Sequence, residues 1–316
     1  MNAALADSAV VWFVEPDGQT VAIAGGKGAS LARMSAAGLP VPPGFVVRAE
    51  ALAATLEKAG VLAQVRQVLG ELRGADTAGA AAEQLMAMVQ GSPIDEALSG
   101  QIRSAYSTLG DDLPVAVRSS ACAEDGEAAS YAGQQETYLN VRGADAVVRH
   151  VTDCWASFFA ERALFYRRQK GSLEDLAMAV VVQRQLDPEK SGVLFTIDPV
   201  QRRRDQMVVE AAWGLGEAVV QGLVVPDHYV VARDGRAKHV RVSRQSVAIV
   251  RAADGGTREV ELDPEQGDAR VLSDEELQRL AEFGRNLQES FGGPQDIEWA
   301  IEDDTIYLLQ SRPVTT

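Results

Sequence analysis

The segment that decides the fold lies near the end of the printed sequence, and it reads Gln295-Asp296-Ile297-Glu298-Trp299 and then, after a short interval, Leu308-Leu309-Gln310-Ser311-Arg312-Pro313. Polar and apolar residues alternate in both halves, which is typical of strands that bury one face. The acidic run 302–304 stands between the halves and favours a turn. The segment therefore predicts a terminal β-hairpin in a strand-rich second half of the chain.

The register of this hairpin decides which side chains share a face. We expect three cross-strand pairs, namely Ile301 with Thr305, Glu298 with Leu308 and Asp296 with Gln310. Alternation then brings four polar residues together, Asp296, Glu298, Gln310 and Arg312. The apolar residues expected behind them are Ile297, Trp299, Tyr307 and Leu309. A slip of one residue would scatter both sets.

The four polar residues are a candidate site for a metal ion and a phosphate. A carboxylate from Glu298 and an amide oxygen from Gln310 suit Mg²⁺, which takes few protein oxygens and completes its shell with water and substrate phosphates. Arg312 is placed to neutralise a phosphate beside them. The alternative is a solvated polar face on a terminal hairpin, and the pattern leaves both interpretations open.

A glycine-rich segment near the start of the chain is the second candidate. It reads Ala24-Gly25-Gly26-Lys27-Gly28-Ala29-Ser30 and leads into an expected helix over 28–37. Backbone N–H groups, the positive end of a helix and the Lys27 charge together make a phosphate cradle. The spacing is neither that of a Walker A loop nor that of a Rossmann fingerprint. A turn with a solvated lysine is the alternative.

A third candidate extends over 115–141. Residues 115–117 form an expected strand that delivers Arg118 to its end, and small and hydroxyl residues follow before a second strand. A strand–loop–strand unit of this kind can act as a flap over phosphates, with Arg118 as its fixed cation. An ordinary hairpin in which Arg118 pairs with Glu124 or Asp125 fits the pattern equally well.

Two further groups of residues receive structural interpretations. The segment 213–217 lacks the third glycine of a dinucleotide turn, since Val219 stands there, and a tight glycine turn is expected. The histidines match no metal-binding pattern and are expected on the surface or in packing: His150, His228 and His239.

The chain divides into a helix-rich front and a strand-rich rear. Amphipathic periods and glycine stops predict helices over 28–37, 49–59, 80–89, 144–169 and 273–291. The last of these begins with a capping box made by Ser273 and Glu276. Apolar runs predict strands over 176–183, 192–197, 207–211, 229–232, 240–242 and 246–251. We expect a helix-rich lobe over 1–184, a strand-rich lobe with a metal-binding terminal hairpin over 185–316, and a hinge near 185–190.

Composition limits the classes of function. The chain has 316 residues and a formal net charge of −15, which repels nucleic acids and anionic membranes over long range. No apolar run approaches the roughly 20 residues of a membrane span, and residues 1–7 lack the basic start of a signal peptide. Two cysteines, Cys122 and Cys154, make no disulfide framework. We therefore expect a cytoplasmic protein that binds neither nucleic acid nor membrane.

Five segments, taken in order, resemble the N-terminal nucleotide-binding domain of the phosphoenolpyruvate synthase and pyruvate phosphate dikinase family, to which rifampin phosphotransferases also belong. The segments are GGKGASLARMSAAGLPVPPGFVV, VRSSACAEDGEAASYAGQQETYLNV, VVVQRQLDPEKSGVLFTIDPV, WGLGEAVVQGLVVPDHYVV and QDIEWAIEDDTIYLLQSRP. They span nearly the whole chain, and five ordered motifs are more specific than any one. The resemblance implies an α+β chain with an ATP-grasp fold, in which two lobes hold the nucleotide between them.

The resemblance also implies a role for each residue of the candidate sites. Lys27, Arg118 and Arg312 are implied as the catalytic cations that contact the phosphates. Glu298 and Gln310 are implied as the ligands of Mg²⁺.

The remaining roles that the resemblance implies concern the rest of the nucleotide. Asp296 is expected near the metal and the phosphates. Gly133 and Thr137 are expected in the loop that closes over the triphosphate. Adenine is expected to be read by three residues between the lobes: Gln183, Gln185 and Leu186.

Members of this family transfer the β-phosphoryl group of ATP to a histidine on a separate swivelling domain, release AMP and phosphate, and pass the phosphoryl group to an acceptor. The resemblance therefore implies the ATP-binding component of a dikinase-type phosphotransferase, with ATP and Mg²⁺ as cofactors. Its partners are expected to be a phosphohistidine domain or subunit, which this sequence lacks, and a small-molecule acceptor such as pyruvate. The alternatives are the ATP-binding domain of a rifampin phosphotransferase, a split enzyme like the phenylphosphate synthases, a nucleotide-sensing module without turnover, and a scaffold that binds no nucleotide.

Overall fold

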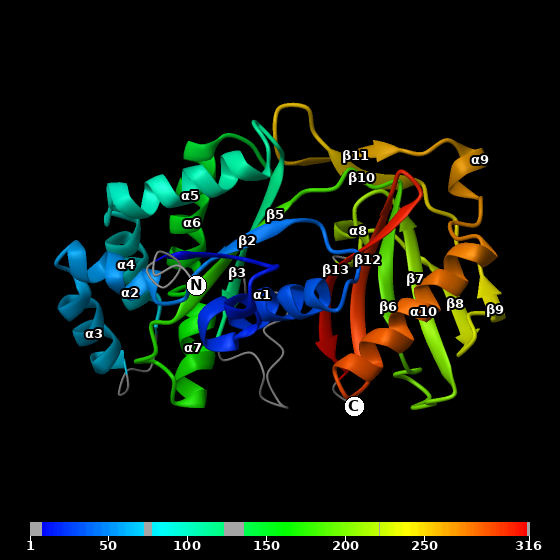
Figure 1. Cartoon of the computed structure of the whole chain (residues 1–316), viewed down its shortest axis with the longest axis horizontal. Coiled ribbons are helices and arrows are strands. Elements are labelled where there is room, and N and C mark those ends of the chain that lie inside the picture. The colour runs from blue at the N-terminus through cyan, green and yellow to red at the C-terminus, as the bar shows by residue number, and fades with distance from the viewer. Residues whose placement is uncertain (1–7, 73–77, 123–135, 221, 315–316) are drawn as a thin grey trace. The chain divides into compact units, whose positions relative to one another are not determined.

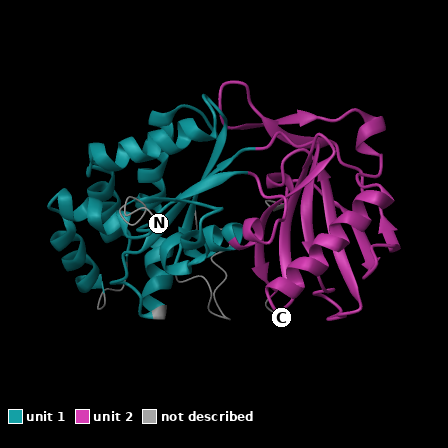
Figure 2. Ribbon diagram, in the orientation of Figure 1, with its two compact units in different colours: residues 1–32, 43–185 teal, residues 33–42, 186–316 magenta. Residues whose placement is uncertain are grey.

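The computed structural model describes residues 8–72, 78–122, 136–220 and 222–314. The chain separates into two compact units (Figure 2). Unit 1 comprises residues 1–32 and 43–185, and unit 2 comprises residues 33–42 and 186–316. Each unit is built around an antiparallel sheet of its own (Figure 1).

Unit 1 contains a five-stranded sheet in which every neighbouring pair is antiparallel. Its strands, in spatial order, are β1 (Val10–Trp12), β2 (Gly44–Val47), β5 (Met178–Arg184), β3 (Val115–Ala121) and β4 (Thr137–Val141). The first six residues of β5 are buried, because a central strand that is covered on both faces needs side chains that leave water on both. The apolar run that predicts a strand over 176–183 thus forms the middle of the sheet.

Six helices enclose the larger hydrophobic core of unit 1 against one face of this sheet. They are α2 (Ala51–Lys58), α3 (Leu62–Glu71), α4 (Gly79–Gln90), α5 (Glu96–Leu109), α6 (Ala144–Ser157) and α7 (Glu161–Lys170). The sheet contributes alternate residues to the core, such as Val180 and Val182 of β5. The Trp155 indole N–H of α6 donates to the Met178 carbonyl (3.2 Å) and ties the helical layer to the central strand.

The helix predicted over 144–169 is in fact two helices, α6 and α7. The chain turns between them where Phe158 and Phe159 both enter the core. The buried Arg167 guanidinium stacks over the Phe158 ring at 3.8 Å and donates to the Phe158 carbonyl (3.4 Å). These contacts stabilise the turn, and Phe165 in the second helix is 51% exposed.

α1 (Val21–Ala36) packs on the other face of the sheet and begins earlier than the predicted 28–37. Gly28 approaches the sheet so closely that a Cβ there would lie 3.0 Å from Val46 Cγ2. Gly25 interrupts the helical backbone with a φ of 67°, which glycine adopts without strain. The helix therefore continues on both sides of a glycine kink, with a second helical segment starting next to Lys27.

Unit 2 contains a six-stranded antiparallel sheet, a two-stranded sheet and three helices among the residues described. The large sheet, in spatial order, consists of β13 (Thr305–Pro313), β12 (Gln295–Glu302), β6 (Lys190–Phe195), β7 (Gln206–Trp213), β8 (Asp227–Ala232) and β9 (Ala237–Arg241). The smaller elements are α8 (Glu217–Val220), β10 (Val247–Arg251), β11 (Thr257–Glu261) and α9 (Pro264–Gly267).

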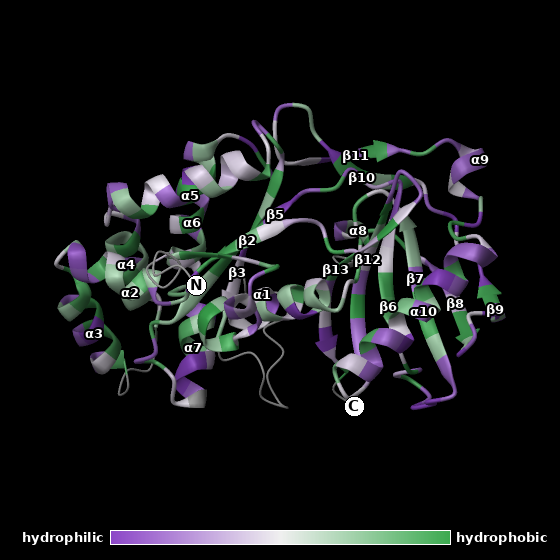
Figure 3. Ribbon diagram, in the orientation of Figure 1, coloured by the Kyte–Doolittle hydropathy of each residue, from purple (hydrophilic) through white to green (hydrophobic). Residues whose placement is uncertain are grey.

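α10 (Asp274–Ser290) covers one face of the large sheet. The predicted capping box is confirmed, since Glu276 N–H donates to Ser273 Oγ (3.2 Å) and Ser273 N–H donates to Glu276 Oε2 (2.7 Å). A Cβ at Gly284 would lie 3.0 Å from Leu194 Cδ2, so the helix packs closely on β6. Figure 3 shows hydrophilic residues on the outer turns of α10 and hydrophobic residues along the strands. The opposite face of the sheet carries the polar side chains of the candidate site.

Residues 33–42 belong to unit 2, whereas the sequence places them in the first lobe. The backbone N–H of Leu308 in β13 donates to the Pro40 carbonyl (2.8 Å). An edge strand has backbone groups to spare, and this segment uses one of them. A contact across so long a stretch of sequence leaves no local pattern, so the sequence could not indicate that this segment groups with unit 2. Within the described parts of both units, none of the helices has the length and apolar character needed to cross a bilayer.

Candidate functional site

The terminal hairpin forms between β12 and β13 with a register that differs from the predicted one. From the turn up to the bulge, the register pairs Glu302 with Thr305 and Trp299 with Leu308. Beyond the bulge, it pairs Glu298 with Gln310 and Asp296 with Arg312. The three predicted pairs are therefore wrong: Ile301 with Thr305, Glu298 with Leu308 and Asp296 with Gln310.

A β-bulge at Leu309 explains why the polar residues nevertheless share one face. Trp299 faces Leu308 whereas Glu298 faces Gln310, so Leu309 is the extra residue. An extra residue reverses the alternation of side chains beyond it. Before the bulge, β13 buries Ile306 and Leu308, and not the predicted Tyr307 and Leu309. Beyond the bulge, the even-numbered residues of β13 return to the face that carries the even-numbered residues of β12.

Asp296 and Arg312 form an ion pair on this face. Nε and Nη2 of Arg312 each lie 2.8 Å from Oδ2 of Asp296. Burial raises the pKa of the Asp296 carboxyl, the Arg312 guanidinium opposes that rise, and the Glu298 and Glu210 carboxylates add to it. The Asp296 side chain is 10% exposed and that of Arg312 is 47% exposed. A surface guanidinium is thus held by a buried acid.

Glu298 and Gln310 are direct cross-strand partners, so a carboxylate and an amide project side by side. Both side chains are half-buried. Mg²⁺ is commonly held by one or two carboxylates together with substrate phosphates and water, and the donor set of this pair fits such an ion. Among the described residues, no group of three or more His, Cys, Asp or Glu side chains is arranged to hold a metal.

Glu210 and His228 lie on the same face and were not found from the sequence. The registers of β12, β6, β7 and β8 place Glu298 in one row with Val193, Glu210 and His228. His228 Nδ1 lies 3.6 Å from Glu210 Oε1, and each side chain is about one-third exposed (29% and 33%). Alternation within β7 and β8 cannot reveal this row, because the row depends on which strands are neighbours.

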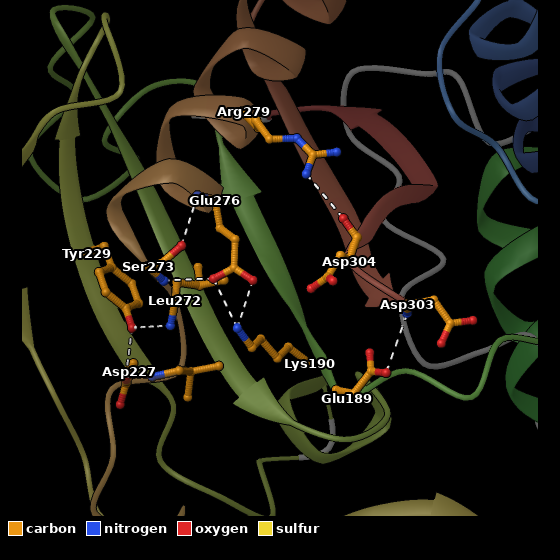
Figure 4. A network of polar contacts seen from close by, with 11 residues as sticks. Glu189, Lys190, Asp227, Tyr229, Leu272, Ser273, Glu276, Arg279, Asp303 and Asp304 are labelled. Carbon is orange, nitrogen blue, oxygen red and sulfur yellow. Dashed lines mark hydrogen bonds and ion pairs between the residues drawn. The ribbon is translucent and has the colours of Figure 1, made fainter.

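On the face of the sheet that α10 covers, a network of polar contacts connects the strands to the start of that helix (Figure 4). Lys190 Nζ lies 2.7 and 3.0 Å from the two carboxylate oxygens of the capping residue Glu276. The Tyr229 hydroxyl donates to Asp227 Oδ2 (2.7 Å) and accepts from the Leu272 N–H (3.0 Å). These bonds attach the helix to β6 and β8, so the strands that carry the polar face are supported from behind.

In unit 1, three of the predicted site residues come together although they are distant in sequence. Arg118 of β3 pairs across the sheet with Thr137 of β4. Lys27 Nζ donates to the carbonyl of Ser119, the next residue of β3 (3.1 Å). Two cations and a hydroxyl therefore gather at one place, which is suitable chemistry for a phosphate. The acidic partners considered for Arg118 lie within 123–135, outside the described residues.

The glycine-rich segment before Lys27 is folded against Ser120. The Gly28 N–H donates to Ser120 Oγ (3.1 Å), and that hydroxyl donates to the Ala24 carbonyl (2.8 Å). A Cβ at Gly25 would overlap the Ser120 carbonyl oxygen. The Gly28 N–H of the predicted cradle is thus used within the protein. The cradle stays a prediction for the other groups of the segment, including the Lys27 charge beside a helix start.

The residues expected around adenine lie at the end of β5 and just beyond it. Gln183 is the sixth residue of β5, and Gln185 closes unit 1 with its backbone N–H bonded to the Pro114 carbonyl (2.8 Å). Leu186 is the first residue of the second segment of unit 2. All three of these side chains are buried. Gly133 lies outside the described residues.

The turn over 213–217 has a structural role, in line with its sequence interpretation. Gly214 has a φ of 78°, and the Leu215 N–H donates to the Ile249 carbonyl (2.8 Å). A Cβ at Gly214 would overlap that carbonyl oxygen. The glycine therefore permits the close approach of β10 to the end of β7.

With this geometry in view, comparison with known proteins identifies the family. A family model described as pyruvate phosphate dikinase, AMP/ATP-binding domain, matches residues 21–316. The chain belongs to this family. Among curated relatives of this AMP/ATP-binding domain, the probable phosphoenolpyruvate synthase of Methanocaldococcus jannaschii is 42% identical over 318 residues. The protein of the same name from Archaeoglobus fulgidus is 44% identical over 315 residues, and the rifampicin phosphotransferase of Streptomyces sviceus is 41% identical over 307.

These alignments cover 97%, 97% and 96% of the AMP/ATP-binding domain described here, but only 27%, 42% and 35% of the respective relatives. The chain therefore spans less than half the length of each. A solved structure, D-alanyl-alanine synthetase A of Vibrio cholerae, aligns with 94% of this chain and 57% of that one at a TM-score of 0.39 and 10% identity. A likeness at that level carries no conclusion about the fold.

Proposed function

We propose that this chain is the ATP-binding part of a dikinase-type phosphotransferase. In the proposed reaction ATP is split to AMP and phosphate, and its β-phosphoryl group passes to a histidine on a separate domain or partner and then to an acceptor such as pyruvate. Family membership supports the nucleotide, and the relatives named phosphoenolpyruvate synthases support the acceptor. One observation carries the proposal, the two neighbouring cross-strand pairs of unit 2, Asp296 with Arg312 and Glu298 with Gln310.

The proposal includes an ATP-grasp arrangement, in which a helix-rich lobe over 1–184 and a strand-rich lobe over 185–316 hold the nucleotide between them. Residues 33–42 are the exception, since they cluster with unit 2. The buried end of β5 and the residue that follows it are proposed to contact adenine: Gln183, Gln185 and Leu186. Thr137 and Gly133 are proposed to close over the triphosphate, and the position of Thr137 beside Arg118 supports the first of these.

The chemistry required of these residues is positioning and charge neutralisation, because the proposal assigns the acceptor histidine to a separate domain or partner. Lys27, Arg118 and Arg312 neutralise the phosphates in this proposal. A unit charge 4 Å from another is worth about 4 kcal/mol at the effective dielectric of a protein surface. A few such cations therefore outweigh the diffuse repulsion from a net charge of −15.

Glu298 and Gln310 are proposed to hold Mg²⁺. The ion, when bound, supplies further neutralisation of the phosphate oxygens as the phosphoryl group moves. The paired carboxylate and amide support this assignment, since they provide two oxygens and leave the remaining positions to phosphates and water.

A second acceptor is supported by the comparisons. The rifampicin phosphotransferase relative is nearly as similar as the two synthases, at 41% against 42% and 44% identity. The ATP-binding part of a rifampicin phosphotransferase is therefore the second candidate, and both candidates assign the same role to the residues described here.

Calorimetry with ATP and Mg²⁺ tests the proposal on the wild type and on the variants Lys27→Ala and Glu298→Ala. We expect each variant to bind at least about tenfold more weakly, because each loses a charge-assisted contact. Lys58→Ala is the matched control, since Lys58 is an exposed lysine of unit 1 that pairs with Asp95. Equal heats from the wild type and both site variants would remove the proposal.

A further inference from the structure

We propose that Asp296 is a positioning residue that orients Arg312, and that it does not coordinate the metal ion. This inference rests on the proposed function, because it concerns how the ATP site is assembled. The family resemblance implies only that Asp296 lies near the metal and the phosphates, and the present inference assigns it a specific role.

The contact between Asp296 and Arg312 has a specific geometry. Arg312 presents its Nε and Nη2 to one oxygen of Asp296, both at 2.8 Å. A side-on contact of this kind fixes the plane of the guanidinium and leaves Nη1 outside the pair. The acid is buried and the arginine is half-exposed, so the group that a ligand meets on this face is the guanidinium.

The β-bulge in the hairpin backbone also favours this pairing. The bulge at Leu309 brings Asp296 and Arg312 directly opposite each other. In a regular ladder that kept Leu309 opposite Glu298, Arg312 would point to the face that α10 covers. The hairpin thus contains a specific irregularity whose result is this pairing and the neighbouring pair of Glu298 with Gln310.

One carboxylate oxygen of Asp296 is already engaged by the guanidinium of Arg312. The Oδ2 of Asp296 accepts a hydrogen bond from Nε of Arg312 and lies 2.8 Å from Nη2 in the ion pair. That oxygen therefore already faces the positive charge of the guanidinium. Glu298, which is half-buried and faces an amide, remains the carboxylate suited to an ion.

An exposed arginine is flexible, and its ordering upon ATP binding would cost affinity. The buried acid orders it beforehand. The consequence is that removal of Asp296 weakens ATP binding only through Arg312. In a variant that already lacks the arginine, removal of the acid has little further effect.

A double-mutant cycle tests this by calorimetry with ATP and Mg²⁺ on the wild type, Asp296→Ala, Arg312→Ala and the double variant. We expect about tenfold weaker binding for Asp296→Ala, a larger loss for Arg312→Ala, and a double variant that matches Arg312→Ala within twofold. Asp296→Asn keeps an oxygen acceptor for the guanidinium, and we expect it to recover most of the affinity. Thermal midpoints of all variants check that the fold is retained, and Asp296→Val, which fills a buried strand position without an acceptor, replaces Asp296→Ala if the latter does not fold.

A titration with Mg²⁺ at fixed ATP separates the two roles. The Mg²⁺ concentration that gives half-maximal binding should stay unchanged in Asp296→Asn and rise in Glu298→Gln. Independent, additive losses in the cycle, or a shifted Mg²⁺ requirement in Asp296→Asn, would overturn the inference and leave the proposed function standing. No heat from the wild type would remove the proposed function and this inference together.

Discussion

Single glycines decide where the Lys27 charge is placed. Gly25 lies against the backbone of Ser120 with a φ of 67°, while Gly38 has a φ of 72° and no atoms within 4 Å of the point that a Cβ would occupy. Both positions have a positive φ, and Gly25 combines it with a ψ of 176°, a region that essentially only glycine adopts. The space around the two positions differs as well.

We predict that Gly25→Ala lowers the free energy of unfolding of the protein more than Gly38→Ala does. Both substitutions force alanine to adopt a positive φ, which costs roughly 1–3 kcal/mol. Only Gly25→Ala also overlaps Ser120, which adds about 1–3 kcal/mol. Denaturant unfolding of both variants measures the difference, and equal losses of stability would show that the close approach of α1 to β3 is absent.

Between elements, the attachment of α10 to β6 depends on charge. Burial raises the pKa of Glu276, but hydrogen bonds from Lys190 and from the Ser273 backbone outweigh it, and the net pKa lies below the usual 4.5. A carboxyl group whose pKa is lowered by folding stabilises the folded state above its ordinary pKa. This contribution disappears as the pH falls through the lowered value.

We predict that Glu276→Gln reduces the stability of unit 2 near neutral pH and flattens its decline in acid. The expected loss is about 1 kcal/mol from the ion pair with Lys190, because glutamine can keep the capping bond to the Ser273 N–H. Unfolding midpoints between about pH 3 and pH 7 measure both effects. Glu282→Gln, an exposed residue of the same helix, is the control. The prediction fails if the two variants show the same pH profile.

In the terminal hairpin, the alternation of polar and apolar residues predicts the strands correctly but not their register. The pattern predicts two strands and the face shared by Asp296, Glu298, Gln310 and Arg312, and the structure has both. The individual pairs were wrong, because an extra residue such as Leu309 has no distinct local pattern. The long helix over 144–169 was wrong for a related reason, since the tertiary contacts of Arg167 and Phe158 create the turn within it.

We predict that insertion of one alanine between Leu309 and Gln310 abolishes Mg-ATP binding while unit 2 remains folded. The inserted residue takes the place opposite Glu298, and Gln310 and Arg312 turn towards α10. β13 is an edge strand, so the other strand pairings persist. Deletion of Leu309 removes the bulge but leaves Gln310 opposite Glu298, and this variant should bind like the wild type. Retained affinity in the insertion variant would contradict the importance of this register.

For the whole molecule, the sequence could indicate two groups of residues but not their three-dimensional assembly. Lys27, Arg118 and Thr137 assemble within unit 1, and Glu298 and Gln310 pair within unit 2. The row that adds Glu210 and His228, and the membership of 33–42 in unit 2, depend on strand order and on one long-range hydrogen bond. Neither leaves a local pattern in the chain.

The proposed function requires that one nucleotide is bound by groups from both units. A crystal structure of the chain with Mg²⁺ and a non-hydrolysable ATP analogue is the decisive test. We predict a triphosphate within hydrogen-bonding distance of Lys27 Nζ, with an ion shared between its oxygens and those of Glu298 and Gln310. A nucleotide that contacts one unit only, with the Lys27 ammonium and the Glu298 carboxylate on separate surfaces, would contradict the account.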